Sequence, residues 1–208
     1  MPKAPTNAKQ RRQASKEKSV KASTDWLKFN SKSTEGQCLS NFANLMVHVN
    51  GETYFNGEAA FHGEKMKCVA RYMPEGPEKE ALVIYAARFL GISDPRLAKR
   101  MGSAGVMPLS KEQLRPWDTK HAFLTQRAIC HYKCRIYAEV RKLLAASQGR
   151  PLLHQNNRAR ESDAWGGRID TTTGKLVGQN QLGKIWMQMR DNLCSSDATE
   201  CNLQGVRI

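Results

Sequence analysis

Three side chains of different chemistry lie within the segment Gly57-Glu-Ala-Ala-Phe-His-Gly-Glu-Lys65. Glu58 and Lys65 are seven residues apart, which at roughly 100° per residue returns them to nearly the same face of an α-helix two turns later. Phe61, one turn after Glu58, falls beside them. A carboxylate, an aromatic ring and an amine in one stripe suit a pocket for a charged or ring-bearing ligand. An exposed Glu/Lys helix face has the same spacing, so the rest of the chain must decide between the two interpretations.

Short-range signals predict the elements that position this helix. Asn50-Gly51 lies between two apolar runs and predicts a short β-hairpin over 45–55, which leads into a helix from Glu58 to about Tyr72. The apolar spacing predicts further helices over 78–90, 95–101 and 119–146, and a last one containing 182–193. The helix over 119–146 is the longest and is predicted to be a continuous structural spine.

Two capping signatures support these boundaries. Asp94-Pro95 is typical of an N-cap followed by proline at the first helical position. Ser110 with Gln113 three residues on is a capping box that predicts a brief helical turn. The sequence therefore predicts a mainly α fold with a minor β component, in one compact helical domain with an N-terminal β-hairpin.

Composition predicts one domain and an anionic partner. The 208 residues carry 33 basic and 19 acidic side chains, for a formal net charge of +14. Residues 1–24 hold seven basic residues against one acidic residue and are predicted to be a disordered basic tail. The domain is expected over 25–194, with a C-terminal tail over 195–208. This charge favours phosphate-bearing ligands or nucleic acid as partners, through the tail and the folded surface.

The sequence gives no support for a membrane protein, a metalloprotein or a kinase-like enzyme. No window approaches 18 apolar residues and the N-terminus has no secretory apolar core, so we expect an intracellular protein, cytoplasmic or nuclear, without a membrane partner. The six cysteines are expected to be free thiols, and no ligand spacing predicts a metal site or another cofactor. Kinase, Walker-type nucleotidase and metallohydrolase motifs are missing from the sequence.

Eight ordered pieces of the chain resemble the NADAR (YbiA-like) family. From about residue 26 to 193 they are Leu39-Ser-Asn-Phe42, Asn50-Gly51, Glu58-x-x-Phe61-x-x-x-Lys65, Ala98-Lys99-Arg100-x-Gly102, Trp117, Asp163-x-Trp165-Gly166-Gly167, Gly178-x-Asn180-x-Leu182-Gly183 and Met189-Arg190. The resemblance implies a YbiA-like helical domain that acts as an N-glycosidase, a hydrolase of the ribose C1–N bond. The implied substrates are ADP-ribose attached to guanine, free or in nucleic acid, or phosphoribosylated intermediates of the riboflavin pathway.

This reaction needs an anion near C1, a proton for the departing base and a partner for C1. Glu58 is the carboxylate we assign to proton transfer or charge stabilisation. The resemblance implies a reactive lysine, which is either Lys65 or Lys99, forming a Schiff base with ring-opened ribose. Lys99 is equally suited to a phosphate contact together with Arg100. His62 could titrate near neutrality, but the resemblance gives it no role.

The second acid carried over from the resemblance is Asp163. The family has its acid three residues before the Trp-Gly pair, where this chain has Ser162, so Glu161 remains the alternative. The other residues assigned to substrate binding are Asn41, Phe42, Phe61, Arg100, Trp117, Trp165, Gly166 and Asn180.

Two of these residues have equally good structural interpretations. Trp117 could stack on the base or pack in the core. Asn180 suits a phosphate-facing helix terminus or a helix N-cap. Because the acid motif is shifted, the competing interpretation of the whole chain is a non-catalytic module that binds ADP-ribose or nucleic acid.

Overall fold

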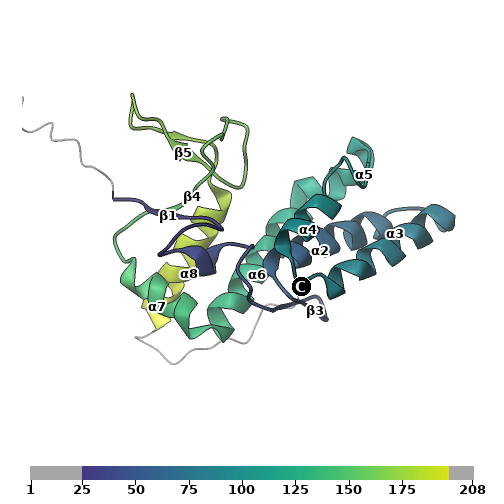
Figure 1. Ribbon diagram of the computed structural model, residues 1–208, viewed down its shortest axis with the longest axis horizontal. Coiled ribbons are helices and arrows are strands. Elements are labelled where there is room, and N and C mark those ends of the chain that lie inside the picture. The colour runs from purple at the N-terminus through teal and green to yellow at the C-terminus, as the bar shows by residue number, and fades with distance from the viewer. Residues whose placement is uncertain (1–24, 197–208) are drawn as a thin grey trace, which may run out of the picture.

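Helices make up most of residues 25–196, the part of the chain that the computed structural model describes (Figure 1). The α-helices are α2 (Gly57–Arg71), α3 (Pro77–Ala87), α4 (Pro95–Met101), α5 (Lys111–Pro116), α6 (Ala122–Ile136), α7 (Ala138–Ala146) and α8 (Gln181–Ser196). The 3₁₀-helices are η1 (Gln37–Leu39) and η2 (Arg88–Gly91), and η3 (Trp117–His121) is a π-helix. The predicted basic tail and residues 197–208 lie outside the described residues.

Short strands form three separate pairs. β2 (Val47–Val49) and β3 (Glu52–Tyr54) are antiparallel, and β1 (Leu27–Phe29) pairs in parallel with β4 (Leu152–His154). A third, antiparallel pair joins β5 (Arg168–Ile169) to β6 (Leu176–Val177). The β2–β3 turn has positive φ at Asn50 (51°) and Gly51 (84°), as a two-residue hairpin turn requires. The predicted mainly α fold with a short hairpin is confirmed.

The prediction of one continuous helix over 119–146 is wrong. Tyr137 is extended (φ −98°, ψ 115°) and separates α6 from α7. Its hydroxyl donates to the carbonyl oxygen of Met46 at 2.8 Å. Arg141 donates to the carbonyl oxygens of Cys134 (3.1 Å) and Arg135 (2.6 Å), which have no partner once α6 ends. These hydrogen bonds give partners to the carbonyl groups at the C-terminal end of α6 and allow α7 to pack beside α8.

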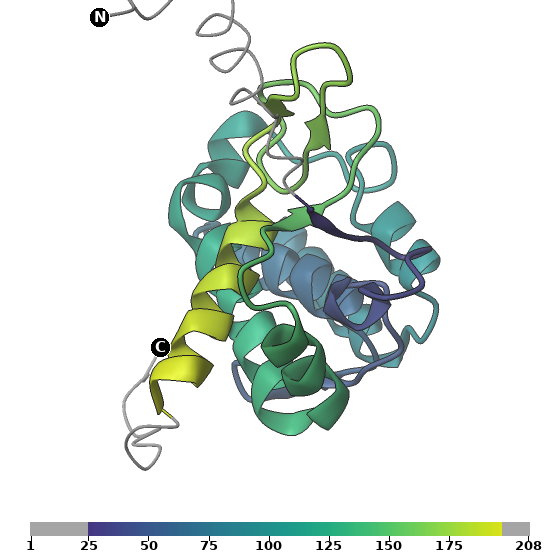
Figure 2. The same ribbon diagram turned by 90° about the vertical axis from the view of Figure 1, so that its left-hand side faces the viewer.

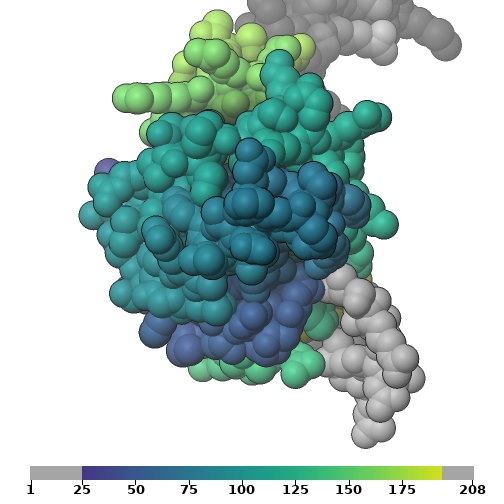
Figure 3. All heavy atoms as spheres, turned by 90° about the vertical axis from the view of Figure 1, so that its right-hand side faces the viewer, coloured from purple at the N-terminus to yellow at the C-terminus, as the bar shows by residue number. Residues whose placement is uncertain are grey.

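Two large apolar clusters and a small one of Cys68, Trp117 and Ala122 form the core of the described residues, and α6 contributes to all three. Ile129 packs with α2, α3, α4 and the β2–β3 hairpin, whereas Cys130 and Cys134 pack with β1, β4, α7 and α8. Figure 1 shows these two groups of elements on opposite sides of α6. Figure 2 shows α8 and α7 together at one end, and Figure 3 shows the opposite end. Among the described helices, none is long and apolar enough to cross a membrane.

Candidate active site

The N-terminus of α2 places Glu58 close to the loop that follows η1. The side chain of Asn56 caps the helix by accepting the N–H of Ala59 at 2.8 Å, and the carbonyl of Asn41 accepts the N–H of Glu58 at 3.0 Å. A Cβ atom at Gly57 would lie 2.8 Å from Oδ1 of Asn41, so this close approach requires glycine. Glu58 is only 9% exposed and lies in the first turn of the helix.

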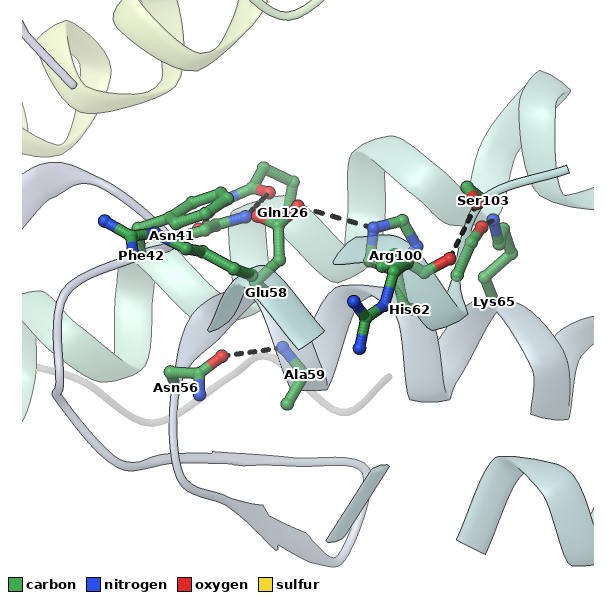
Figure 4. A network of polar contacts seen from close by, with 12 residues as sticks. Asn41, Phe42, Asn56, Glu58, Ala59, His62, Lys65, Arg100, Ser103 and Gln126 are labelled. Carbon is green, nitrogen blue, oxygen red and sulfur yellow. Dashed lines mark hydrogen bonds and ion pairs between the residues drawn. The ribbon is translucent and has the colours of Figure 1, made fainter. Parts of the chain in front are cut away.

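His62 lies one turn after Glu58 and faces it (Figure 4). Its Nε2 is 3.4 Å from Oε1 of Glu58, and its buried Nδ1 has no hydrogen-bond partner within residues 25–196. The imidazole packs directly on Gly102 at the end of α4, where an added Cβ would come within 2.2 Å of the ring. The sequence analysis gave His62 no role, and the structure places it in contact with the proposed catalytic carboxylate.

Lys65 lies two turns after Glu58 on the same side of α2, as predicted. Its Nζ donates to the carbonyl oxygen of Gly102 at 2.5 Å. Burial lowers the pKa of Lys65, and the carboxylates of Asp118 and Glu58 partly oppose this shift. A lowered pKa increases the fraction of the neutral amine, the form that can attack carbon.

Lys99 reaches the same region from α4. Asn56 fixes that helix relative to α2, because its Nδ2 donates to the carbonyls of Ile92 (3.3 Å) and Ser93 (3.0 Å) just before α4 begins. Lys99 is exposed, with Nζ 5.4 Å from the centre of the Phe42 ring. Arg100 beside it is also exposed. Both cations are therefore open to an anionic ligand.

Asn41 and Gln126 form a reciprocal pair of amides. Nδ2 of Asn41 donates to Oε1 of Gln126 at 2.7 Å, and Nε2 of Gln126 donates back to Oδ1 of Asn41 at 3.0 Å (Figure 4). Gln126 lies on α6 and is 2% exposed. The pair anchors the Asn41–Phe42 loop to α6, so the side chain of Asn41 is already engaged by the protein.

His154, at the end of β4, is a candidate that the sequence analysis missed. Its Nδ1 is 3.2 Å from the carbonyl oxygen of Trp165, which can only accept, so Nδ1 carries the proton. Burial lowers the pKa of His154, while the Trp165 carbonyl and Glu58 raise it and Lys99 lowers it. Trp165, whose carbonyl contacts His154, also packs against Phe61 of α2, so the end of β4 lies near α2.

Aromatic rings form a wall beside this cluster. The ring of Phe61 lies 5.0 Å from that of Trp117 and 5.5 Å from that of Trp165, in both cases edge to face. Trp117 is 3% exposed and packs with Phe61, Cys68 and Ala122, so it offers no open face to a base in the active site. Of the two interpretations of Trp117, core packing fits the structure. Phe61 and Trp165 are partly buried and form the exposed side of the wall.

The loop that carries the second predicted acid is held by its own hydrogen bonds. Asp163 Oδ2 accepts from the backbone N–H of Arg160 (3.0 Å) and from the side chain of Asn156 (3.3 Å). Glu161 is exposed. The structure thus gives Asp163 a part in shaping the loop.

Gly166 and Asn180 support His154. A Cβ at Gly166 would lie 2.9 Å from the carbonyl oxygen of His154. Asn180 is 1% exposed, accepts the N–H of His154 at 3.0 Å and donates to the carbonyl of Leu152 at 2.8 Å. The prediction that the Asn180 side chain binds substrate therefore conflicts with its burial. Its amide holds β4 in place.

The fold is similar to the NMR structure of the E. coli protein YbiA, with a TM-score of 0.58 and 26% sequence identity over 88% of this chain and 92% of that chain. The chain has a YbiA-like fold. No protein-family model matches the sequence, and no curated protein matches it.

The YbiA-like scaffold thus carries an acid, two imidazoles and two amines around the start of α2. Within residues 25–196, no three His, Cys, Asp or Glu side chains are grouped as metal ligands would be. The arrangement offers a carboxylate in a helix N-terminus, a partly buried amine and exposed cations. These groups suit acid–base and nucleophilic chemistry on an anionic substrate.

Proposed function

We propose that this protein is an N-glycosidase that hydrolyses a ribose C1–N bond, with ADP-ribosylated guanine as its substrate. The observation that carries the proposal is the placement of Glu58, His62 and Lys65 on one side of α2, next to Lys99 of α4. The YbiA-like fold and the resemblance of the sequence motifs to the NADAR family support the same reaction.

In the proposed reaction Lys65 is the nucleophile. Its neutral amine attacks C1 of the ring-opened ribose, the bond from C1 to the base nitrogen breaks, and the base leaves with a proton. Water then hydrolyses the resulting imine, which releases C1 as an aldehyde and regenerates the amine. The lowered pKa of Lys65 supports this assignment over the exposed Lys99.

Glu58 supplies the proton transfers in this scheme, and its contact with His62 holds its carboxylate. Lys99 and Arg100, both exposed, bind the diphosphate of the substrate, and the Phe42 ring lies beneath Lys99. Trp165 and Phe61 border the base. These assignments leave Trp117 and Asn180 as structural residues.

The test compares wild type with Glu58→Gln, Lys65→Arg and Lys99→Arg on ADP-ribosylated guanosine, with released guanosine followed by chromatography. We expect Glu58→Gln to lower the rate by about 100-fold or more, the usual size of an acid–base contribution. Lys65→Arg should abolish covalent trapping of ADP-ribose by cyanoborohydride, and Lys99→Arg should mainly raise KM. Trapping that survives in Lys65→Arg and disappears in Lys99→Arg would reverse the roles of the two lysines.

Two other substrate outcomes have a defined meaning. Release of base only from a 5-phosphoribosylamino pyrimidine would identify a hydrolase of riboflavin intermediates. The binding-module alternative is favoured by Asp163, whose carboxylate is occupied within its own loop. Binding of ADP-ribose without cleavage of either substrate would refute the N-glycosidase and establish that alternative.

A further inference from the structure

A second cleft, of about 610 Å³, lies between α2, η3, α6 and the β2–β3 turn. The residues of α2 that line it are Glu64, Cys68 and Arg71. Glu64 is six residues from Glu58 and so points about 120° away from it around the helix. The cleft is therefore distinct from the candidate active site, and its volume is typical of small-ligand pockets.

The mouth of this cleft is positively charged. Its acid, Glu64, is only 4% exposed and is already engaged by Asn50 (2.6 Å), the Tyr54 hydroxyl (2.6 Å) and Nζ of Lys67 (3.4 Å). Arg71 and Lys120, by contrast, are exposed and take part in no ion pair within residues 25–196. The mouth of the cleft thus presents two uncompensated cations.

The positive charge continues along α6. On α6, Arg127, His131 and Arg135 follow one another at intervals of four residues, which keeps them on one helix face, and Lys120 precedes them in η3. Burial lowers the pKa of His131, and repulsion by Arg135 and Arg127 lowers it further, so this imidazole adds no positive charge at neutral pH but shows that the two arginines lie close to it. The arginines and Lys120 are spread along the surface, and cations placed in this way match a chain of phosphates better than a single anion.

One wall of the cleft is apolar. Trp117, Leu124 and Ala128 line it, and Trp117 also packs on Phe61 of the candidate active site. An apolar wall beside polar groups and a cationic mouth suits a nucleobase joined to a phosphate. Because Trp117 borders the cleft and Phe61 borders the active site, the two sites share one aromatic wall.

We propose that this cleft binds one nucleotide unit of a single-stranded nucleic acid, with phosphates on Arg71 and Lys120 and the neighbouring phosphates along α6. A single strand is inferred because a paired and stacked base could not enter the cleft. The site would place a strand next to the aromatic wall, so that a modification on it can reach Glu58. This inference extends the proposed function, but strand binding does not require the hydrolase activity.

The test is fluorescence anisotropy of a labelled 12-nucleotide single strand titrated with the full chain at several salt concentrations. The cleft variant is Arg71→Gln with Lys120→Gln, and the matched control is Lys28→Gln with Lys175→Gln, two exposed lysines on other elements. Each phosphate contact contributes about 0.7 to the slope of log K against log salt concentration. Loss of the two contacts at Arg71 and Lys120 should therefore weaken binding of the cleft variant by about 25-fold at 0.1 M salt. Its slope should fall by about 1.4, while the control keeps the wild-type affinity and slope.

A strand carrying 5-iodouridine locates the contact directly. Cross-links to peptides that cover 117–128 are expected. Equal weakening of both variants, or cross-links confined to other segments, would overturn the proposal. Lys120→Gln alone, at an exposed position, should weaken binding about 5-fold and provides the same comparison if the paired variant is unstable.

The activity assays keep this inference separate from the N-glycosidase proposal. The cleft variant should cleave ADP-ribosylated guanosine at the wild-type rate and an ADP-ribosylated oligonucleotide more slowly. If wild type cleaves neither but the binding pattern holds, the catalytic proposal fails and the cleft assignment stands. If both are cleaved equally well by the cleft variant, and its strand binding is unchanged, the cleft assignment fails alone.

Discussion

Replacing Gly102 with alanine should move His62 and disturb the active site without any backbone strain. Gly102 has φ −78° and ψ 0°, which alanine adopts readily. The added Cβ would lie 2.2 Å from Cγ and Nδ1 of His62 and 2.7 Å from its Cβ. Because the Cβ of His62 is itself too close, rotation of the imidazole cannot relieve the contact, and α4 must shift away from α2.

The expected cost follows from two opposing effects. Overpacking in a buried contact costs about 1–3 kcal/mol, and replacing glycine by alanine at a compatible position returns about 0.4–1 kcal/mol. Gly102→Ala should therefore lower the free energy of unfolding by about 1–2 kcal/mol. The shift of α4 also moves the carbonyl of Gly102 that holds Lys65, so kcat should fall as well.

The assay is urea unfolding followed by tryptophan fluorescence and circular dichroism. The matched control is Gly91→Ala, where an added Cβ meets no atom of the described part of the chain within 4 Å, so its stability should stay level or rise by up to about 1 kcal/mol. In a double-mutant cycle with His62→Gly, alanine at position 102 should cost at least about 1 kcal/mol less than it does opposite histidine. An equal cost of Gly102→Ala in both backgrounds would refute the contact.

Two further predictions concern stability. Burial lowers the pKa of Lys133 to about 8 in the folded protein, whereas the pKa of an unfolded lysine is near 10.4. Between these two pH values the unfolded chain binds more protons than the folded protein. The free energy of unfolding should therefore rise with pH by about 1.4 kcal/mol per pH unit, relative to the Lys133→Met variant. Urea unfolding of both proteins at pH 7 to 10 measures this difference, and a flat difference would contradict a buried ammonium. Asn56→Ala should cost about 2–3 kcal/mol, because it removes both the cap of α2 and the donors to the carbonyls of Ile92 and Ser93. Asp94→Ala should cost only about 1 kcal/mol in the same assay, because it removes only an exposed cap of α4, and equal losses would argue against the bridging role of Asn56.

The features that sequence reasoning predicted depend on neighbouring residues. The hairpin turn at Asn50-Gly51 and the cap at Asp94 are set by local backbone chemistry, and both occur as expected. The one-sided placement of Glu58 and Lys65 follows from helical periodicity alone.

The features that it missed depend on residues far apart in the sequence. The break at Tyr137 is stabilised by Met46, 91 residues earlier. β1 and β4 have only three residues each, too few to give a clear strand pattern in the sequence. Their pairing brings Leu27 next to Leu152, which lies far away in the sequence. His154 lies at the end of that strand, so no local signal placed it near Glu58 or Lys99.

The reciprocal amides of Asn41 and Gln126 restrict how this sequence can change. Replacing Asn41 leaves Oε1 of Gln126 without its partner and Nε2 with only Sγ of Cys130 at 3.5 Å, and Gln126 is too deeply buried to find water. A single substitution is therefore costly at both positions, whereas a simultaneous exchange to two matched apolar side chains can be nearly neutral. We expect the two positions to vary together among related proteins, and covariation between them would identify this loop anchor from sequence alone.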